Sequence, residues 1–165
     1  MIIVIMGVAG TGKSTVGELL ATELHDKFLD GDSLHPPRNI EKMTHGIPLT
    51  DADRAPWLAA IHGCIVESLQ RAEDLVVACS ALKQRYRDAL NSGVVITWVY
   101  LKGSKELIWD RLQQRKHHFM KPQMLASQFA DLEEPADAIV VDVAVEPSAI
   151  VGQIVNALRV RAKAS

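Results

Sequence analysis

The feature that most constrains this chain is a glycine-rich segment that directly follows an apolar run near the start of the sequence. The run, residues 2–6, reads I-I-V-I-M, and residues 7–14 fit the pattern G-x-x-x-x-G-K-S. The residues that follow, 15–24, suit an amphipathic helix. A strand, a glycine loop and a helix in this order form the context that a phosphate-binding P-loop requires. We therefore expect the chain to bind a nucleoside triphosphate.

Each residue type in this segment has a physical reason. Glycines allow backbone conformations that a side chain would forbid, so that successive N–H groups can converge on phosphate oxygens. The helix N-terminus adds a partial positive charge. Lys13 offers a mobile charge to the β- and γ-phosphates, and Ser14 offers a hydroxyl to Mg²⁺. The residues expected to bind ATP here are Gly7, Gly10, Thr11, Gly12, Lys13, Ser14 and Thr15. A glycine-rich turn without a ligand is the alternative, and the Lys-Ser ending argues against it.

Composition limits the remaining classes of protein. A length of 165 residues suits one domain, and 48% hydrophobic residues suffice for a core. The net charge of −2 does not favour a nucleic-acid or membrane partner. We expect no signal peptide and no membrane span, because no basic leader and no sufficiently long apolar run is present. Cys64 and Cys79 are expected to be reduced thiols of a cytoplasmic protein.

Apolar runs alternate with helical patterns along the whole chain. We expect strands at 2–6, 27–32, 75–79, 94–101 and 139–145, with helices between them and after the last. This alternation predicts an α/β fold with a parallel sheet and helices on both faces. We expect a three-layer P-loop fold with five strands in the order 2-3-1-4-5. The single domain, 1–165, would carry an acceptor-binding helical insertion at about 33–72 and a helical lid at about 111–134.

A pair of carboxylates ends the second expected strand. The carboxyl ends of parallel strands lie at one edge of the sheet, where ligands bind. Asp30 and Asp32 occupy alternate positions, so they point the same way if the strand stays extended. One carboxylate could orient water on Mg²⁺, and the other could accept a hydroxyl proton from a substrate. Asp-Gly-Asp is also good turn chemistry, which leaves a structural role open.

Positive charge is concentrated in three places beyond the P-loop. A small anionic acceptor and the transferring phosphoryl group both need such charge nearby. Solvation alone, however, explains most exposed Lys and Arg residues. Arg111 and Arg115 are spaced i, i+4 and could close over the phosphates as part of a lid that excludes water. The three groups are Arg54; Lys83, Arg85 and Arg87; and Arg111, Arg115, Lys116, His117, His118 and Lys121.

Several longer stretches resemble those of a known family. Residues 30–36 read D-G-D-x-L-H-P and residues 81–88 read A-L-K-x-x-Y-R-D. Further matching stretches, at 39–43, 46–51, 53–58, 118–120 and 127–135, extend over nearly the whole chain. With the P-loop, these stretches resemble the small bacterial-type gluconokinases, relatives of shikimate kinase and the nucleoside monophosphate kinases.

The resemblance implies ATP-dependent phosphorylation of D-gluconate to 6-phospho-D-gluconate by direct in-line transfer, in a homodimer. It implies that Ser14 and Asp30 hold Mg²⁺, with Asp30 acting through a water molecule. Asp32 would contact the acceptor hydroxyls and act as base. Adenine would lie between the Arg111 helix and the loop near Pro147. The remaining implied roles are catalysis by Lys13, Asp32 and Arg115, and binding of the sugar acid by His35, Arg54, Lys83 and Arg87. His35 could instead cap the helix that Pro36 opens.

Two alternatives remain at this point. One is another small-acceptor P-loop kinase, acting on shikimate, on a nucleoside monophosphate or on a hexonate other than gluconate. Shikimate kinases have a glycine cluster after the third strand, whereas residues 79–83 here read C-S-A-L-K. The other alternative is a nucleotide-binding switch without catalytic activity. Such a protein would need neither an acceptor carboxylate nor an arginine-rich lid.

Overall fold

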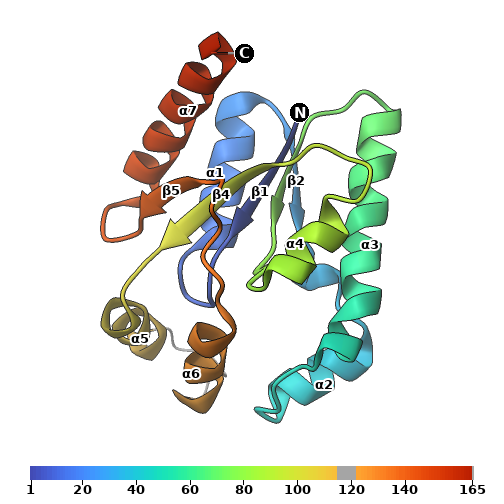
Figure 1. The fold of residues 1–165 in the computed structure, drawn as a ribbon. Helices are drawn as coiled ribbons and strands as arrows, with labels where there is room; N and C mark the ends of the chain where they lie inside the picture. Colours follow the sequence, from blue (N-terminus) through green and yellow to red (C-terminus); the bar gives the residue numbers. More distant parts are fainter. Residues whose placement is uncertain (115–121, 165) are drawn as a thin grey trace.

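Five short parallel strands form the centre of the computed structural model, which describes residues 1–114 and 122–164 (Figure 1). The strands are β1 (Ile2–Met6), β2 (Lys27–Asp30), β3 (Leu75–Ala78), β4 (Thr97–Lys102) and β5 (Ile139–Asp142). They are arranged in the order β2-β3-β1-β4-β5, and each neighbouring pair is parallel. The predicted fold class and strand order are confirmed.

Helices cover both faces of this sheet. Those described are α1 (Lys13–Leu24), α2 (Pro37–Thr44), α3 (Asp51–Gln70), α4 (Gln84–Leu90), α5 (Lys105–Gln114), α6 (Pro122–Asp131) and α7 (Pro147–Ala164), with a 3₁₀ helix, η1, at Gly31–Leu34. In Figure 1, α1 and α7 lie on one side of the sheet, and α3 and α4 lie on the other. Within the described ranges, no helix is both long enough and apolar enough to cross a membrane.

The central strand β1 is buried on both of its faces, which explains its unbroken apolar sequence. Ile2, Val4 and Met6 belong to the core packed beneath α3 and α4. Ile3 and Ile5 belong to the core beneath α1 and α7. A third, smaller cluster joins the P-loop to the helices α5 and α6 through Val8, Leu82, Ile108, Leu112 and Leu125. These three clusters fix the P-loop between the sheet and the helices around it.

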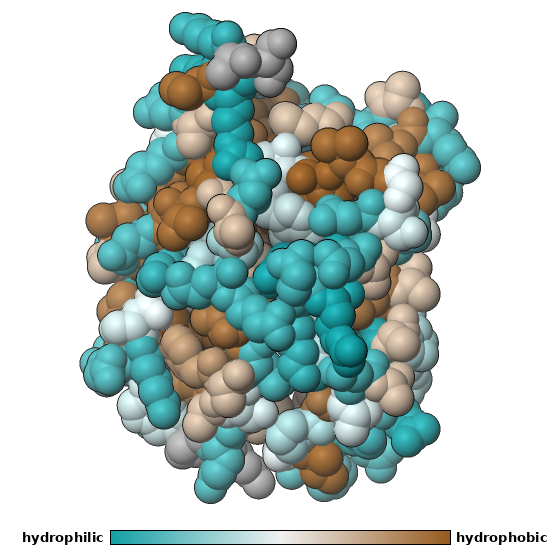
Figure 2. Space-filling model, viewed as in Figure 1, coloured by the Kyte–Doolittle hydropathy of each residue, from teal (hydrophilic) through white to brown (hydrophobic). Residues whose placement is uncertain are grey.

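The second and third strands end at Asp30 and Ala78, short of the expected Asp32 and Cys79, and the fourth and fifth differ more from their apolar runs. The fourth begins at Thr97 because Val94 ends a turn, its N–H donating to Asn91 O, and Val95 is 88% exposed. The fifth ends at Asp142, whose side chain accepts a hydrogen bond from Ala144 N and turns the chain. Hydrophilic residues cover the middle of the face seen in Figure 2, and apolar residues form separate patches around them.

Candidate active site

The P-loop connects β1 to α1 and has the backbone conformation that its glycines allow. Gly10 has φ +84° and Gly12 has φ +90°, in the left-handed region that side chains avoid. A Cβ atom on Gly7, at φ +148°, would lie 2.8 Å from Leu101 O. Thr11 Oγ1 donates to Val8 O at 2.9 Å and braces the loop. The positive φ angles, and at Gly7 also the close approach of Leu101 O, explain why glycine is required at these positions.

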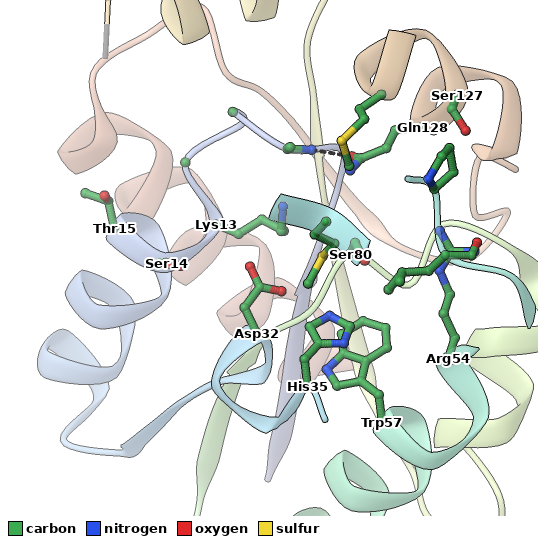
Figure 3. A pocket seen from close by; sticks show the side chains of 17 residues that line it. Lys13, Ser14, Thr15, Asp32, His35, Arg54, Trp57, Ser80, Ser127 and Gln128 are labelled. Atoms are coloured by element: carbon green, nitrogen blue, oxygen red, sulfur yellow. Dashed lines mark hydrogen bonds between the residues drawn. The ribbon is translucent and has the colours of Figure 1, made fainter. Parts of the chain in front are cut away.

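A cavity of about 350 Å³ opens beside this loop. Its lining comes from the P-loop and α1, from η1 and the residue after it, from α2, α3 and the segment between them, from the loop after β3, and from α6 (Figure 3). The residues are Ala9, Gly10, Gly12, Lys13, Ser14, Thr15, Asp32, His35, Met43, Pro48, Leu49, Arg54, Trp57, Ser80, Met124, Ser127 and Gln128. Segments far apart in the sequence therefore meet around one space beside a phosphate-binding loop.

Asp30 and Asp32 have different surroundings. The strand ends at Asp30 and continues as η1, so the two side chains do not follow the alternation that an extended strand would give. Asp30 accepts from Ser14 Oγ at 2.7 Å and from Asp32 N at 3.0 Å. Asp32 instead lines the cavity, near Lys13. The turn chemistry of Asp-Gly-Asp is thus present, and the extended strand that would make both carboxylates point the same way is not.

His35 and Trp57 form one wall of the cavity. Their rings stack with centroids 4.2 Å apart and planes 13° from parallel. Trp57 is 1% exposed and donates from Nε1 to Gly31 O at 2.7 Å. Burial lowers the pKa of His35 and outweighs the opposing effect of Asp32, while Arg54 lowers this pKa further. The Nδ1 atom of His35 lies 3.3 Å from the Nδ2 atom of Asn39, a residue of helix α2. The lowered pKa favours the neutral form of this stacked ring.

Arg54 reaches the cavity from the first turn of α3. The helix begins with a capping box in which Thr50 and Asp53 bond each other's backbone N–H groups. Arg54 Nη1 donates to Leu49 O at 2.7 Å and to Tyr86 Oη at 3.1 Å. These contacts hold the guanidinium at the cavity wall.

Lys83 belongs to an ionic cluster next to Arg54 and does not line the cavity. Its Nζ lies 3.2 Å from Asp51 Oδ1 and 3.6 Å from Asp131 Oδ1. Asp51 also accepts hydrogen bonds from Tyr86 and Arg85. The bond from Tyr86, followed by those from Arg85 and Lys83, lowers the pKa of Asp51 to about 2. Asp131 connects this cluster to helix α6.

Arg87, predicted to bind the sugar acid, is placed away from the cavity. It is 2% exposed and donates from Nη1 to Ala81 O at 2.9 Å and to Leu82 O at 3.1 Å. It also donates to Gln84 Oε1. Helix α4 turns Arg87 toward the protein interior, so its contacts stabilise the loop after β3. These contacts give Arg87 a structural role.

The residues predicted near adenine lie on the other side of the P-loop. Arg111, on α5, donates from Nη2 to Val143 O and so joins α5 to the turn between β5 and α7. Pro147 begins α7 at the end of that turn. Neither residue lines the cavity, so this pair borders a separate region. Arg115, predicted to be catalytic, lies outside the described residues, as do Lys116, His117, His118 and Lys121.

Helix α6 supplies three cavity residues for which the sequence had suggested no chemical role: Met124, Ser127 and Gln128. Gln128 Oε1 accepts a hydrogen bond from Ala9 N of the P-loop at 2.7 Å. The stretch 127–129 had contributed to the family resemblance, but it contains no charged residue. A neutral amide in a sequence does not indicate a function by itself. The role of Gln128 could be recognised only from the structure, in which the P-loop lies beside it.

A P-loop at the carboxyl edge of a parallel sheet, facing a cavity that contains a carboxylate and an arginine, defines a small-molecule kinase of the P-loop class. A family model described as shikimate kinase matches residues 9–159. The thermoresistant gluconokinase of Escherichia coli is 48% identical over 147 residues, covering 86% of this chain and 84% of that protein. The gluconokinase of Gluconobacter oxydans is 50% identical, covering 82% and 76%. The chain belongs to the gluconokinase family.

Solved structures agree with this assignment. A gluconokinase from Sinorhizobium meliloti matches with a TM-score of 0.88 and 44% identity, covering 98% of this chain and 93% of that one. An APS kinase from Mycobacterium tuberculosis matches with a TM-score of 0.69 at 17% identity, which shows a shared fold. The protein is accordingly a kinase, a nucleotide-dependent phosphotransferase that acts on a hydroxyl group.

Proposed function

We propose that this kinase transfers the γ-phosphoryl group of ATP to D-gluconate and produces 6-phospho-D-gluconate. One observation carries the proposal: a single cavity joins the P-loop to Asp32, His35 and Arg54. A polyhydroxy acid needs hydrogen-bond partners along its length and positive charge at its carboxylate. The similarity to gluconokinases over more than four-fifths of the chain supports this choice of acceptor.

The proposed reaction is a direct in-line displacement. Lys13 Nζ, which donates to Val8 O at 3.0 Å, would stabilise the β- and γ-phosphates. Asp32 would accept the proton of the attacking hydroxyl, since its side chain lines the cavity beside Lys13. Covalent chemistry by the protein is not required, because positioning and charge stabilisation supply most of the catalysis of phosphoryl transfer. Cys79, whose pKa burial raises to about 12, is a poor nucleophile.

Ser14 and Asp30 suit a magnesium ion that accompanies the nucleotide. Mg²⁺ in such sites takes one or two protein oxygens, with phosphates and water completing its shell. The Ser14 hydroxyl and the Asp30 carboxylate, 2.7 Å apart, present this kind of donor set beside the P-loop. Ser14 would bind the ion directly, and Asp30 would orient a water molecule on it. When bound, the ion neutralises charge on the β- and γ-phosphates.

Arg54 is the proposed partner of the acceptor carboxylate. It is the arginine among the cavity residues, and its bonds to Leu49 and Tyr86 orient its guanidinium. Lys83 would act indirectly, through Asp51 and Tyr86, because it lies outside the lining. His35 would present its ring to the acceptor, and Arg111 and Pro147 would border adenine.

A coupled assay for ADP release tests this function. With Mg²⁺ and ATP, the acceptors would be gluconate, shikimate, AMP, CMP and other hexonates. We expect turnover with gluconate far above that with the others. Turnover with shikimate or with another hexonate, and not with gluconate, would refute the proposed acceptor but leave the kinase class intact.

Three further properties expected at the outset, the first of them from the resemblance, are also proposed. They are a homodimer, a cytoplasmic location, and one domain with an acceptor-binding insertion at about 33–72 and a lid at about 111–134. Sedimentation equilibrium measures the first. We expect a mass of twice 18.1 kDa, and a concentration-independent monomer would contradict it.

A further inference from the structure

Gln128 connects helix α6 to the P-loop. Its Oε1 accepts from Ala9 N at 2.7 Å, across 119 positions of sequence. A backbone N–H can only donate, so the amide oxygen must face Ala9. The amide nitrogen, Nε2, therefore occupies the other corner of the side-chain amide. The orientation of this half-buried side chain is thus determined by the P-loop.

The Gln128 amide nitrogen has two N–H donors available at the cavity. Gln128 is one of the lining residues, and within the described ranges Nε2 makes no hydrogen bond to another residue. Figure 3 shows Gln128 and Asp32 on opposite sides of Lys13. Asp32 and Gln128 line the same cavity, so an acceptor that fills this cavity has both side chains in its wall.

We propose that Gln128 is a further acceptor-binding residue, whose oxygen anchors α6 to the P-loop and whose NH₂ group donates to an oxygen atom of the polyhydroxy acid. This inference rests on the proposed function. Anchoring to Ala9 gives the donor a fixed position relative to the loop that holds the phosphates. A single amide would in this way align the acceptor with the phosphoryl group that it receives.

Two substitutions separate the anchor from the donor. Gln128→Glu keeps an oxygen for Ala9 N–H but removes the NH₂ group and adds a negative charge. Gln128→Leu removes both functions. Gln123→Glu is the matched control, since Gln123 is an exposed residue of the same helix and does not line the active-site cavity.

The experiment combines steady-state kinetics with ADP titration and thermal melting. We expect Gln128→Glu to keep the wild-type melting temperature and to bind ADP within twofold of wild type. Its kcat/KM for gluconate should fall about 10- to 100-fold, the loss expected for one hydrogen bond and an added repulsion. Gln128→Leu should show a similar fall in kcat/KM, and Gln123→Glu should be unchanged.

Two results would overturn the inference. If Gln128→Glu keeps the wild-type kcat/KM, the amide serves only as an anchor. If Gln128→Leu binds ADP more tightly without a loss of turnover, the hydrogen bond only restrains the empty P-loop. A wild-type protein that does not phosphorylate gluconate would refute the proposed function instead, and this is measured before any variant.

Discussion

Gly31 sits between the two active-site aspartates at a place where the structure has no room for a side chain. A Cβ atom there would lie 2.6 Å from Ala78 O and 3.1 Å from Ile61 Cδ1. Ala78 is in β3, and its backbone is paired with β1 and β2, so the oxygen cannot move without disturbing the sheet. In Gly31→Ala, the chain between Asp30 and Asp32 must move instead.

The size of the effect follows from this contact. Real Cβ atoms essentially never approach a heavy atom closer than 3.0 Å, so the turn must shift by several tenths of an ångström. Overpacking of this kind costs about 1–3 kcal/mol in the free energy of unfolding. Displacement of a catalytic group by about 1 Å can cost about 100-fold in rate. We therefore expect kcat/KM for gluconate to fall about 10- to 100-fold, through Asp32.

Gly63→Ala provides the matched control for Gly31→Ala. A Cβ atom at Gly63, inside helix α3, would meet nothing within 4 Å. The same chemical change should therefore stabilise the protein by about 0.5–1 kcal/mol, through helix propensity, and leave turnover unchanged. Urea unfolding and the coupled assay measure both quantities. The steric argument fails if Gly31→Ala unfolds and turns over like wild type, or if the two alanines act alike.

Three further predictions concern residues in this site and next to it. Asp32→Asn should bind ADP like wild type and lose about 100- to 10,000-fold in kcat, and a variant with full turnover would exclude Asp32 as the base. Arg87→Met should leave the buried Ala81 carbonyl without its donor, whereas Leu82 O keeps the Glu133 N–H, and it should lower the free energy of unfolding by about 1–3 kcal/mol. KM for gluconate should stay within twofold; a raised KM at unchanged stability would instead indicate direct binding. Because burial lowers the pKa of His35 below its ordinary 6.5, the unfolded chain takes up more protons, and stability should fall as pH drops below about 6.5. Urea unfolding at pH 7.5 and 5.5 should show a larger loss in wild type than in His35→Phe, and equal losses would contradict this.

The fold and the phosphate-binding loop could be predicted because their signals are local. The P-loop occupies eight consecutive residues, and its glycines, lysine and serine act through a backbone conformation that those residues themselves permit. The unbroken apolar run of β1 follows from burial on both faces, and alternation with helices restricts the sheet to parallel pairing. The Thr50 capping box is also a contact between near neighbours.

The roles of the residues expected to bind the acceptor depended on the direction in which each side chain points, and the sequence did not reveal that direction. Lys83 and Arg87 are both basic and four positions apart, yet Lys83 joins a surface ionic cluster and Arg87 is buried. Asp30 and Asp32 separate because the chain enters a 3₁₀ helix, which sends one carboxylate to Ser14 and the other to the cavity. Small rotations of short elements decide these outcomes.

By itself, the sequence determined a P-loop kinase with a five-stranded parallel sheet and a resemblance to gluconokinases. Only the tertiary structure decided which polar residues share a cavity. The bond between Ala9 and Gln128 spans 119 positions, and the contact between Arg54 and Tyr86 spans 32. Such contacts depend on how whole helices pack against the sheet. That packing is a sum of many weak contacts, and a motif of a few residues does not encode it.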